Sequence, residues 1–173
     1  MKIIFKDNDT DIRMPVTPFH FGPAACIGLP SQKYIDLPVF ILANVVVDIE
    51  PFLVVFFNLN YPMHGYCHTF LIGSCVGIIW ALIAYWGRAI LHNSMRLLRL
   101  QYNTNFRKIF ISAILGVWFH VLLDAPLYPD IRPFYPLKAN PLYGKMNELS
   151  VYLICTVLFI PAWILYKSKS QRS

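Results

Sequence analysis

The chain has 173 residues, of which 57% are hydrophobic and 14% are charged, and its formal net charge is +6. A soluble domain has about 25% charged residues, so this composition excludes an ordinary soluble globular protein. We expect no nucleic-acid partner, because the basic residues flank apolar segments, where lysine and arginine face the cytoplasm and anionic lipid headgroups.

The N-terminal part combines a polar segment with a short apolar one. Residues 1–16 contain three aspartates, which is not typical of a signal peptide, and we expect them to be extended. Residues 19–29 are apolar but too short to span a membrane comfortably. Thr17 and Pro18 precede them and predict a helix start, with Thr17 as the N-cap and Pro18 in the first turn.

Four further segments are long and apolar enough to be membrane-spanning helices, which need about 20 residues. They cover residues 38–57, 64–91, 109–124 and 148–166. Pro161 predicts a kink in the last one, and five prolines within 125–147 predict a loop. Residues 96–100 suggest an amphipathic surface helix. We therefore predict an all-α integral membrane bundle: a single membrane domain over 1–173, with the bundle at 17–166 and a basic tail at 167–173.

Basic residues predict the orientation of this bundle. If the basic segment 88–108 is cytoplasmic, an even number of crossings places Lys33 and the tail, with Lys167 and Lys169, on the same side. We predict a protein of the prokaryotic cytoplasmic (inner) membrane with the lipid bilayer as its partner. In this topology the start of the second spanning helix and the end of the third face the same side.

Those two helix ends carry potential metal ligands. His64 and His68 are four residues apart, as are His120 and Asp124, and such positions share one face of a helix. Two such pairs at one membrane depth predict a metal site, because charged groups within a membrane are costly unless paired or functional. The alternative is that these histidines are hydrogen-bonded core residues.

Two other residues extend the candidate ligand set. Asp48 lies within the first spanning segment, and His20 lies at the start of the short apolar one. Imidazoles and carboxylates suit zinc, with iron or manganese as other divalent candidates. Glu50 is a candidate for a supporting carboxylate or a general base, and Arg132 for a phosphate clamp or, alternatively, an ion-pair partner of Asp130. The motifs HExxH and GxSxG and a glycine-rich phosphate loop are absent.

The order of these motifs resembles a known family. The chain has Thr17-Pro18-Phe19-His20, Asp48-Ile49-Glu50-Pro51, His64-Gly65-Tyr66-Cys67-His68 and His120-Val121-Leu122-Leu123-Asp124. This order, over residues 17–140, resembles that of the bacterial and archaeal membrane-bound metal-dependent hydrolases. That family is distantly similar to zinc-dependent phospholipase C, an all-helical fold with a multinuclear metal site. The resemblance implies six metal ligands: His20, Asp48, His64, His68, His120 and Asp124. The chain departs from the family at Glu50, where an aspartate is common, and at Gly65, where a basic residue is common.

These residues lead to one functional hypothesis and two alternatives. We expect a metal-dependent hydrolase that acts on a phosphoester of a lipid or lipid-linked substrate, with Asp48 and Glu50 as catalytic carboxylates. The first alternative is metal transport or sensing through the same ligands, which would require an oligomer. The second is a structural membrane subunit without catalysis.

Overall fold

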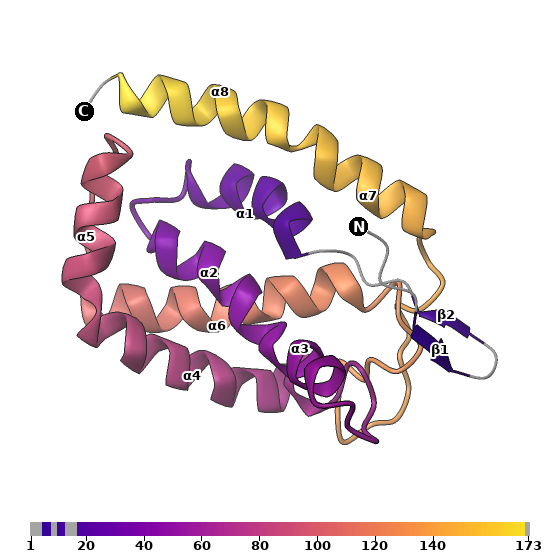
Figure 1. Ribbon diagram of the computed structural model, residues 1–173. Coiled ribbons are helices and arrows are strands. Elements are labelled where there is room, and N and C mark those ends of the chain that lie inside the picture. Colours follow the sequence, from indigo (N-terminus) through magenta and orange to yellow (C-terminus); the bar gives the residue numbers. More distant parts are fainter. Residues whose placement is uncertain (1–4, 8–9, 13–16, 172–173) are drawn as a thin grey trace.

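The computed structural model describes residues 5–7, 10–12 and 17–171 of the chain. Apart from one small hairpin, the described residues form helices and loops (Figure 1). The hairpin pairs β1 (Phe5–Asp7) with β2 (Thr10–Ile12) in antiparallel register. It lies within the segment predicted to be polar and extended. The remaining elements are η1 (Thr17–His20), α1 (Phe21–Gly28), α2 (Leu37–Val47), α3 (Ile49–Phe56), η2 (Tyr66–His68), α4 (Phe70–Trp86), α5 (Arg88–Leu97), α6 (Phe106–Asp124), α7 (Glu148–Val157) and α8 (Phe159–Ser170).

Within the described residues, three helical stretches are long and apolar enough to cross a membrane. They are Leu37–Phe56, which combines α2 and α3, Phe106–Asp124, which is α6, and Glu148–Ser170, which combines α7 and α8. The predicted spans at 38–57, 109–124 and 148–166 correspond to these three. The helical bundle is therefore confirmed at the level of an all-helical protein with apolar helices of membrane length.

The predicted span at 64–91 is where sequence and structure differ most. Its helix begins only at Phe70, because Thr69 caps it by accepting a hydrogen bond from the Ile72 backbone N–H at 3.0 Å. At the other end the chain bends by 75° at Gly87, so that α5 runs across the ends of the other helices (Figure 1). The prediction of one continuous helix here was wrong, and α4 and α5 make a fourth span only if the bent pair counts as one.

Two spanning stretches are interrupted near a proline. Pro51 lacks the N–H that would bond to the Val47 carbonyl, and the helix breaks at Asp48, between α2 and α3. Pro161 likewise lacks an N–H for the Val157 carbonyl, and α7 gives way to α8 at Leu158. The second break confirms the kink predicted for residues 148–166.

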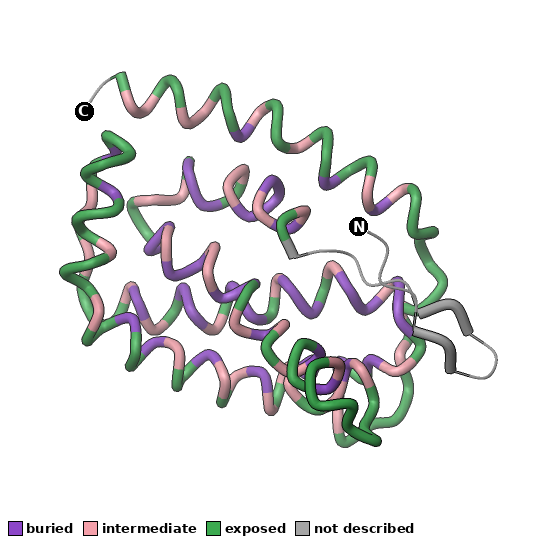
Figure 2. The backbone as a smooth tube through the Cα atoms, in the orientation of Figure 1, coloured by how far each residue is buried: buried purple, intermediate pink, exposed green. Residues whose placement is uncertain are grey.

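Helices α2, α4 and α6 pack closely through small residues, which is how helices associate where lipid replaces water. A Cβ atom on Gly116 of α6 would lie 2.5 Å from the Cβ of Ala43 and 2.5 Å from the carbonyl oxygen of Phe40 on α2. One on Gly77 of α4 would lie 3.1 Å from the Cα of Ile114. Figure 2 shows the buried positions concentrated on α2 and on the inner face of α6. This close approach brings the end of α6 beside the break at Asp48.

Candidate metal centre

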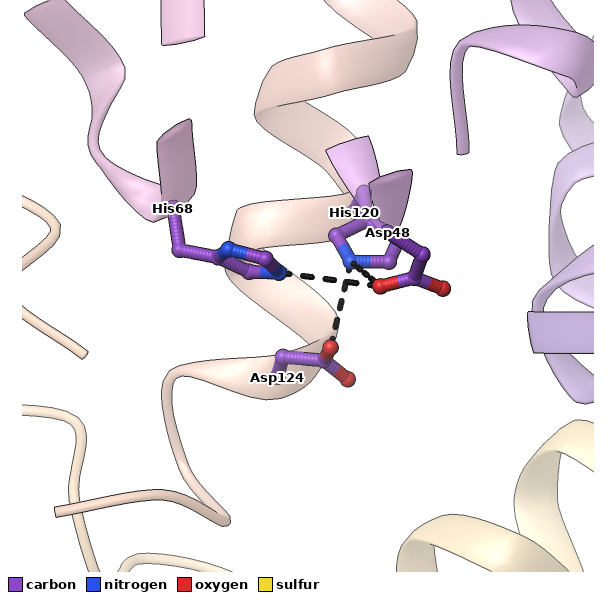
Figure 3. A group of neighbouring side chains, drawn as sticks. All are labelled: Asp48, His68, His120 and Asp124. Atoms are coloured by element: carbon purple, nitrogen blue, oxygen red, sulfur yellow. Dashed lines mark ion pairs between the residues drawn. The ribbon is translucent and has the colours of Figure 1, made fainter. Parts of the chain in front are cut away.

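Four side chains converge at one point between the helices. Single donor atoms of Asp48, His68, His120 and Asp124 all lie within 4.8 Å of one another (Figure 3). The Nε2 atom of His120 is 3.1 Å from Oδ1 of Asp48 and 3.2 Å from Oδ2 of Asp124. The Nε2 atom of His68 is 3.6 Å from Oδ1 of Asp48. This His/Asp cluster could hold a metal ion.

Each of the four side chains comes from the end of an element. His120 and Asp124 lie one turn apart on the last turns of α6, as their spacing predicted. Asp48 is the residue at which α2 gives way to α3. His68 is the last residue of η2, immediately before the capping residue Thr69 of α4. The helix cap and the helix break therefore place His68 and Asp48 opposite the end of α6.

The spacing of the donors fits a single ion. Four ligands about 2.1 Å from a tetrahedral zinc ion lie about 3.4 Å from one another. Three of the six distances between the donor atoms, 3.1, 3.2 and 3.6 Å, bracket this value, and all six are within 4.8 Å. The donor types, two imidazoles and two carboxylates, are those that zinc accepts and that iron and manganese also bind.

Burial supports the same interpretation. His68 and His120 are both 0% exposed, and Asp124 is 2% exposed. Within the described part of the chain, Nε2 of each histidine and Oδ1 of Asp124 have no partner with hydrogen-bond geometry. Buried polar atoms left unpaired are costly and rare in folded proteins. A bound cation would satisfy the two imidazole nitrogens, so the residues present fit a divalent metal.

Glu50 contacts His68 on the side of the ring that faces away from the other donors. Its Oε2 atom is 3.2 Å from Nδ1 of His68 and accepts a hydrogen bond from the Cys67 backbone N–H at 3.1 Å. A carboxylate on the far nitrogen of an imidazole fixes its tautomer and directs the other nitrogen toward a metal. Burial alone would lower the pKa of His68, but the adjacent carboxylates of Asp48 and Glu50 raise that pKa overall.

His20 adjoins the four donors without joining them. Its Nδ1 atom lies 3.1 Å from Nδ1 of His120, and its Nε2 atom lies 3.2 Å from Oδ1 of Asp124. The side chain is 1% exposed and comes from η1, at the start of α1. In this arrangement His20 contacts two of the four donor residues, His120 and Asp124. Its role as a metal ligand stays a prediction.

His64 is held away from the four donors by Asp130. The Nδ1 atom of His64 is 3.2 Å from Oδ1 of Asp130, and its backbone N–H donates to Oδ2 at 2.9 Å. Burial alone would raise the pKa of Asp130, but these contacts with His64 bring it below its ordinary value. The His64 ring stacks on Tyr128 at 4.1 Å and meets the His68 ring edge-on at 4.8 Å. The premise that His64 and His68 share a helix face was wrong, because both precede α4.

The partner of Asp130 was not the one considered from the sequence. Among the described residues its side chain pairs with His64, and no ion pair joins it to Arg132. The sequence offered one signal for the His64–Asp130 pair. His64 lies at the start of the second predicted span and Asp130 follows the end of the third, and these two helix ends were predicted to face the same side of the membrane. Asp48 and Glu50 were both candidate site residues from the sequence. In the structure Asp48 is one of the four donors, and Glu50 contacts His68.

Comparison with known proteins adds no further assignment: no family model, curated protein or solved structure matches the chain. The candidate metal centre therefore rests on the geometry described above.

Proposed function

We propose that the protein is a membrane-embedded, metal-dependent hydrolase that cleaves a phosphoester in a lipid or lipid-linked substrate. The observation that carries this proposal is the convergence, at the end of apolar helices, of two carboxylates and two buried imidazole nitrogens that make no hydrogen bond within the described residues. The resemblance in motif order to membrane-bound metal-dependent hydrolases, with their distant similarity to phospholipase C, points to the same chemistry.

Asp48, His68, His120 and Asp124 would hold the ion, which we propose to be zinc. A divalent ion supplies Lewis acidity at such a site, which makes water more acidic and offsets the charge of phosphate oxygens. A catalytic zinc ion needs a position for water or substrate beside its protein ligands, and zinc can expand from four to five ligands, so water would join the four donors here. The side chain of Asp48 is 19% exposed and that of Glu50 is 12% exposed, whereas both histidines are fully buried. Substrate would therefore approach along this carboxylate edge.

Glu50 is the residue that we assign as proton acceptor. One of its oxygens, Oε2, is engaged by His68 and by the Cys67 backbone N–H. Among the described residues, the other oxygen, Oε1, accepts a single long hydrogen bond, from the Tyr61 hydroxyl at 3.4 Å. Because Oε2 contacts the Nδ1 side of His68, away from the four donors, this second oxygen would take the proton of an attacking water through one bridging water.

The position of the site favours a substrate at the membrane surface. Asp124 is the last residue of α6, and His68 precedes the first turn of α4, so the centre lies at the ends of apolar helices rather than at their middles. Phe52 and Phe56 of the adjoining α3 are 62% and 68% exposed and would contact lipid. A phosphoester in a lipid headgroup would reach this depth without leaving the bilayer.

The test is phosphoester hydrolysis by the full-length protein reconstituted with zinc. Phosphatidylcholine vesicles containing fluorescent phosphatidylglycerol would be sampled over time, and lipid products and released headgroup phosphate would be measured by mass spectrometry. Asp48→Asn and His120→Ala should reduce hydrolysis to the level of empty vesicles. Glu148→Gln, which neutralises a carboxylate at the start of α7, is the matched control and should keep full activity.

Metal content measured on the same samples separates the hypotheses. Hydrolysis by the wild type and by Glu148→Gln, lost together with metal in Asp48→Asn, would support the proposal. Stoichiometric metal in a wild-type protein that hydrolyses neither this lipid nor soluble phosphomonoesters and phosphodiesters would contradict it, and would favour metal transport or sensing.

A further inference from the structure

A second polar site lies at the opposite end of the molecule from the metal centre. It is a cavity of about 450 Å³ where the end of α5, the segment after it and the end of α8 meet. Figure 1 shows the C-terminus of α8 beside the end of α5. The cavity is lined by His92, Arg96, Arg99, Leu100, Gln101, Tyr102 and Ser170. None of these lining residues is acidic.

The cavity has an excess of positive charge. Within the described part of the chain, neither Arg96 nor Arg99 forms an ion pair with a carboxylate. Asp36 is the carboxylate bonded to a lining residue, since it accepts a hydrogen bond from the Tyr102 hydroxyl at 2.9 Å. Asp36 is 1% exposed and also bonded to Thr104. The Asp36 carboxylate is thus buried and bonded to two hydroxyl groups. The guanidinium groups of Arg96 and Arg99 remain available to an anion.

The backbone of Arg99 has a conformation that is uncommon for arginine. Arg99 has a φ of +53°, in the left-handed region that favours glycine. It ends α5 through two bonds that are typical of a glycine-terminated helix, from its own N–H to the Arg96 carbonyl and from the Leu100 N–H to the Met95 carbonyl. An arginine at this position costs stability, and residues kept in such a conformation are concentrated at functional sites.

The surroundings indicate a membrane surface. Helix α5 is bent by 75° from α4 and exposes apolar side chains beside its basic ones: Trp86, which precedes it, Ile90 and Leu97 are 84%, 71% and 85% exposed. This combination is typical of a helix lying in the headgroup layer. Tyr102 and Thr104 precede α6, whereas Asp124 ends it. At about 1.5 Å per residue α6 is about 28 Å long, close to the thickness of a bilayer core of about 30 Å.

We propose that this cavity binds the phosphate of an anionic lipid headgroup on the membrane face opposite the metal centre. Arg96 and Arg99 would hold the phosphate, since planar guanidinium groups match its oxygens. The exposed apolar residues Ile90 and Leu97 would contact the acyl chains, which favours a lipid over free phosphate as the ligand. This site is independent of the proposed hydrolase function.

The test uses the detergent-purified, full-length protein with a metal chelator present, so that the metal centre does not cleave the probe. The probe is dihexanoyl-phosphatidylglycerol, and its binding is measured by native mass spectrometry and titration calorimetry. Dihexanoyl-phosphatidylcholine is the zwitterionic control, and inorganic phosphate is the free-anion control. Loss of one charged hydrogen-bonding group should weaken phosphatidylglycerol binding about tenfold in Arg96→Gln and in Arg99→Gly. Arg99→Gly should at the same time keep or raise the melting temperature, because glycine suits its backbone conformation.

Arg88→Gln is the matched control, since it removes the same charge at the other end of α5, where the guanidinium bonds to the Tyr85 carbonyl and lies over its ring. It should bind phosphatidylglycerol like the wild type. Equal binding by Arg99→Gly and wild type would overturn the proposal. So would an equal loss in Arg88→Gln, which would indicate a general charge effect, or equal affinity for inorganic phosphate, which would indicate a free anion.

Discussion

Neutralising Glu50 tests how the centre is organised. In Glu50→Gln the side chain keeps its size, so the amide can still contact Nδ1 of His68 across the 3.2 Å that separates them. What is lost is the charge. Hydrogen bonds to charged groups contribute about 1.5–3 kcal/mol and neutral ones about 0.5–1.5 kcal/mol, so the change removes about 1–1.5 kcal/mol. This corresponds to about five- to tenfold weaker metal binding.

Glu50→Ala should weaken binding further, because it also removes the contact that orients the His68 ring. Loss of such a supporting partner typically costs about 10- to 100-fold in metal affinity. Zinc affinity would be measured by competition with a chromophoric chelator at neutral pH, with Glu148→Gln as the control that should match the wild type. Zinc affinities of both Glu50 variants within about twofold of the wild type would refute the supporting role. Complete loss of zinc in Glu50→Gln would instead make Glu50 a ligand.

Two further predictions concern the scaffold around the centre. Gly116→Ala places a Cβ 2.5 Å from the Cβ of Ala43 and should destabilise the fold by about 1–3 kcal/mol, measured as a lower melting temperature in detergent. Leu115→Ala, on the exposed side of α6, is the control. An unchanged melting temperature in Gly116→Ala would contradict the close packing. The pKa of Asp130 is lowered by His64, so its stabilisation is present above its ordinary pKa of about 3.9 and is lost as the pH falls through the lowered value. The melting temperatures of wild type and Asp130→Asn should therefore converge as the pH falls below about 4, and a constant difference would contradict this contribution.

The parts of the fold that follow from local sequence were predictable. Helix α6 is a continuous apolar run after a basic segment, and its i,i+4 pair His120 and Asp124 shares one face as the helical period requires. The proline-rich residues 125–147 form no helix, and Pro161 interrupts the last span. In each case the information lies within a few residues of the feature.

The parts that depend on tertiary structure were not predictable from the sequence. Apolar content continues from His64 into α4, so hydropathy gives no signal that Thr69 is the capping residue or that the chain turns at Gly87. The pairing of His64 with Asp130 joins residues that are far apart in the chain and depends on how the loop after α6 folds back. Asp48 was placed only within a predicted span, whereas the structure has it at the break between α2 and α3, with its Oδ1 atom 3.1 Å from Nε2 of His120.

The central claim is that Asp48, His68, His120 and Asp124 bind one divalent ion. The most direct measurement is elemental analysis by inductively coupled plasma mass spectrometry of the detergent-purified protein after zinc loading and desalting. The wild type and His92→Ala, which removes an exposed histidine at the far end, should each retain stoichiometric zinc, and His120→Ala should retain none. A folded wild-type protein that takes up no zinc, iron or manganese would contradict the account.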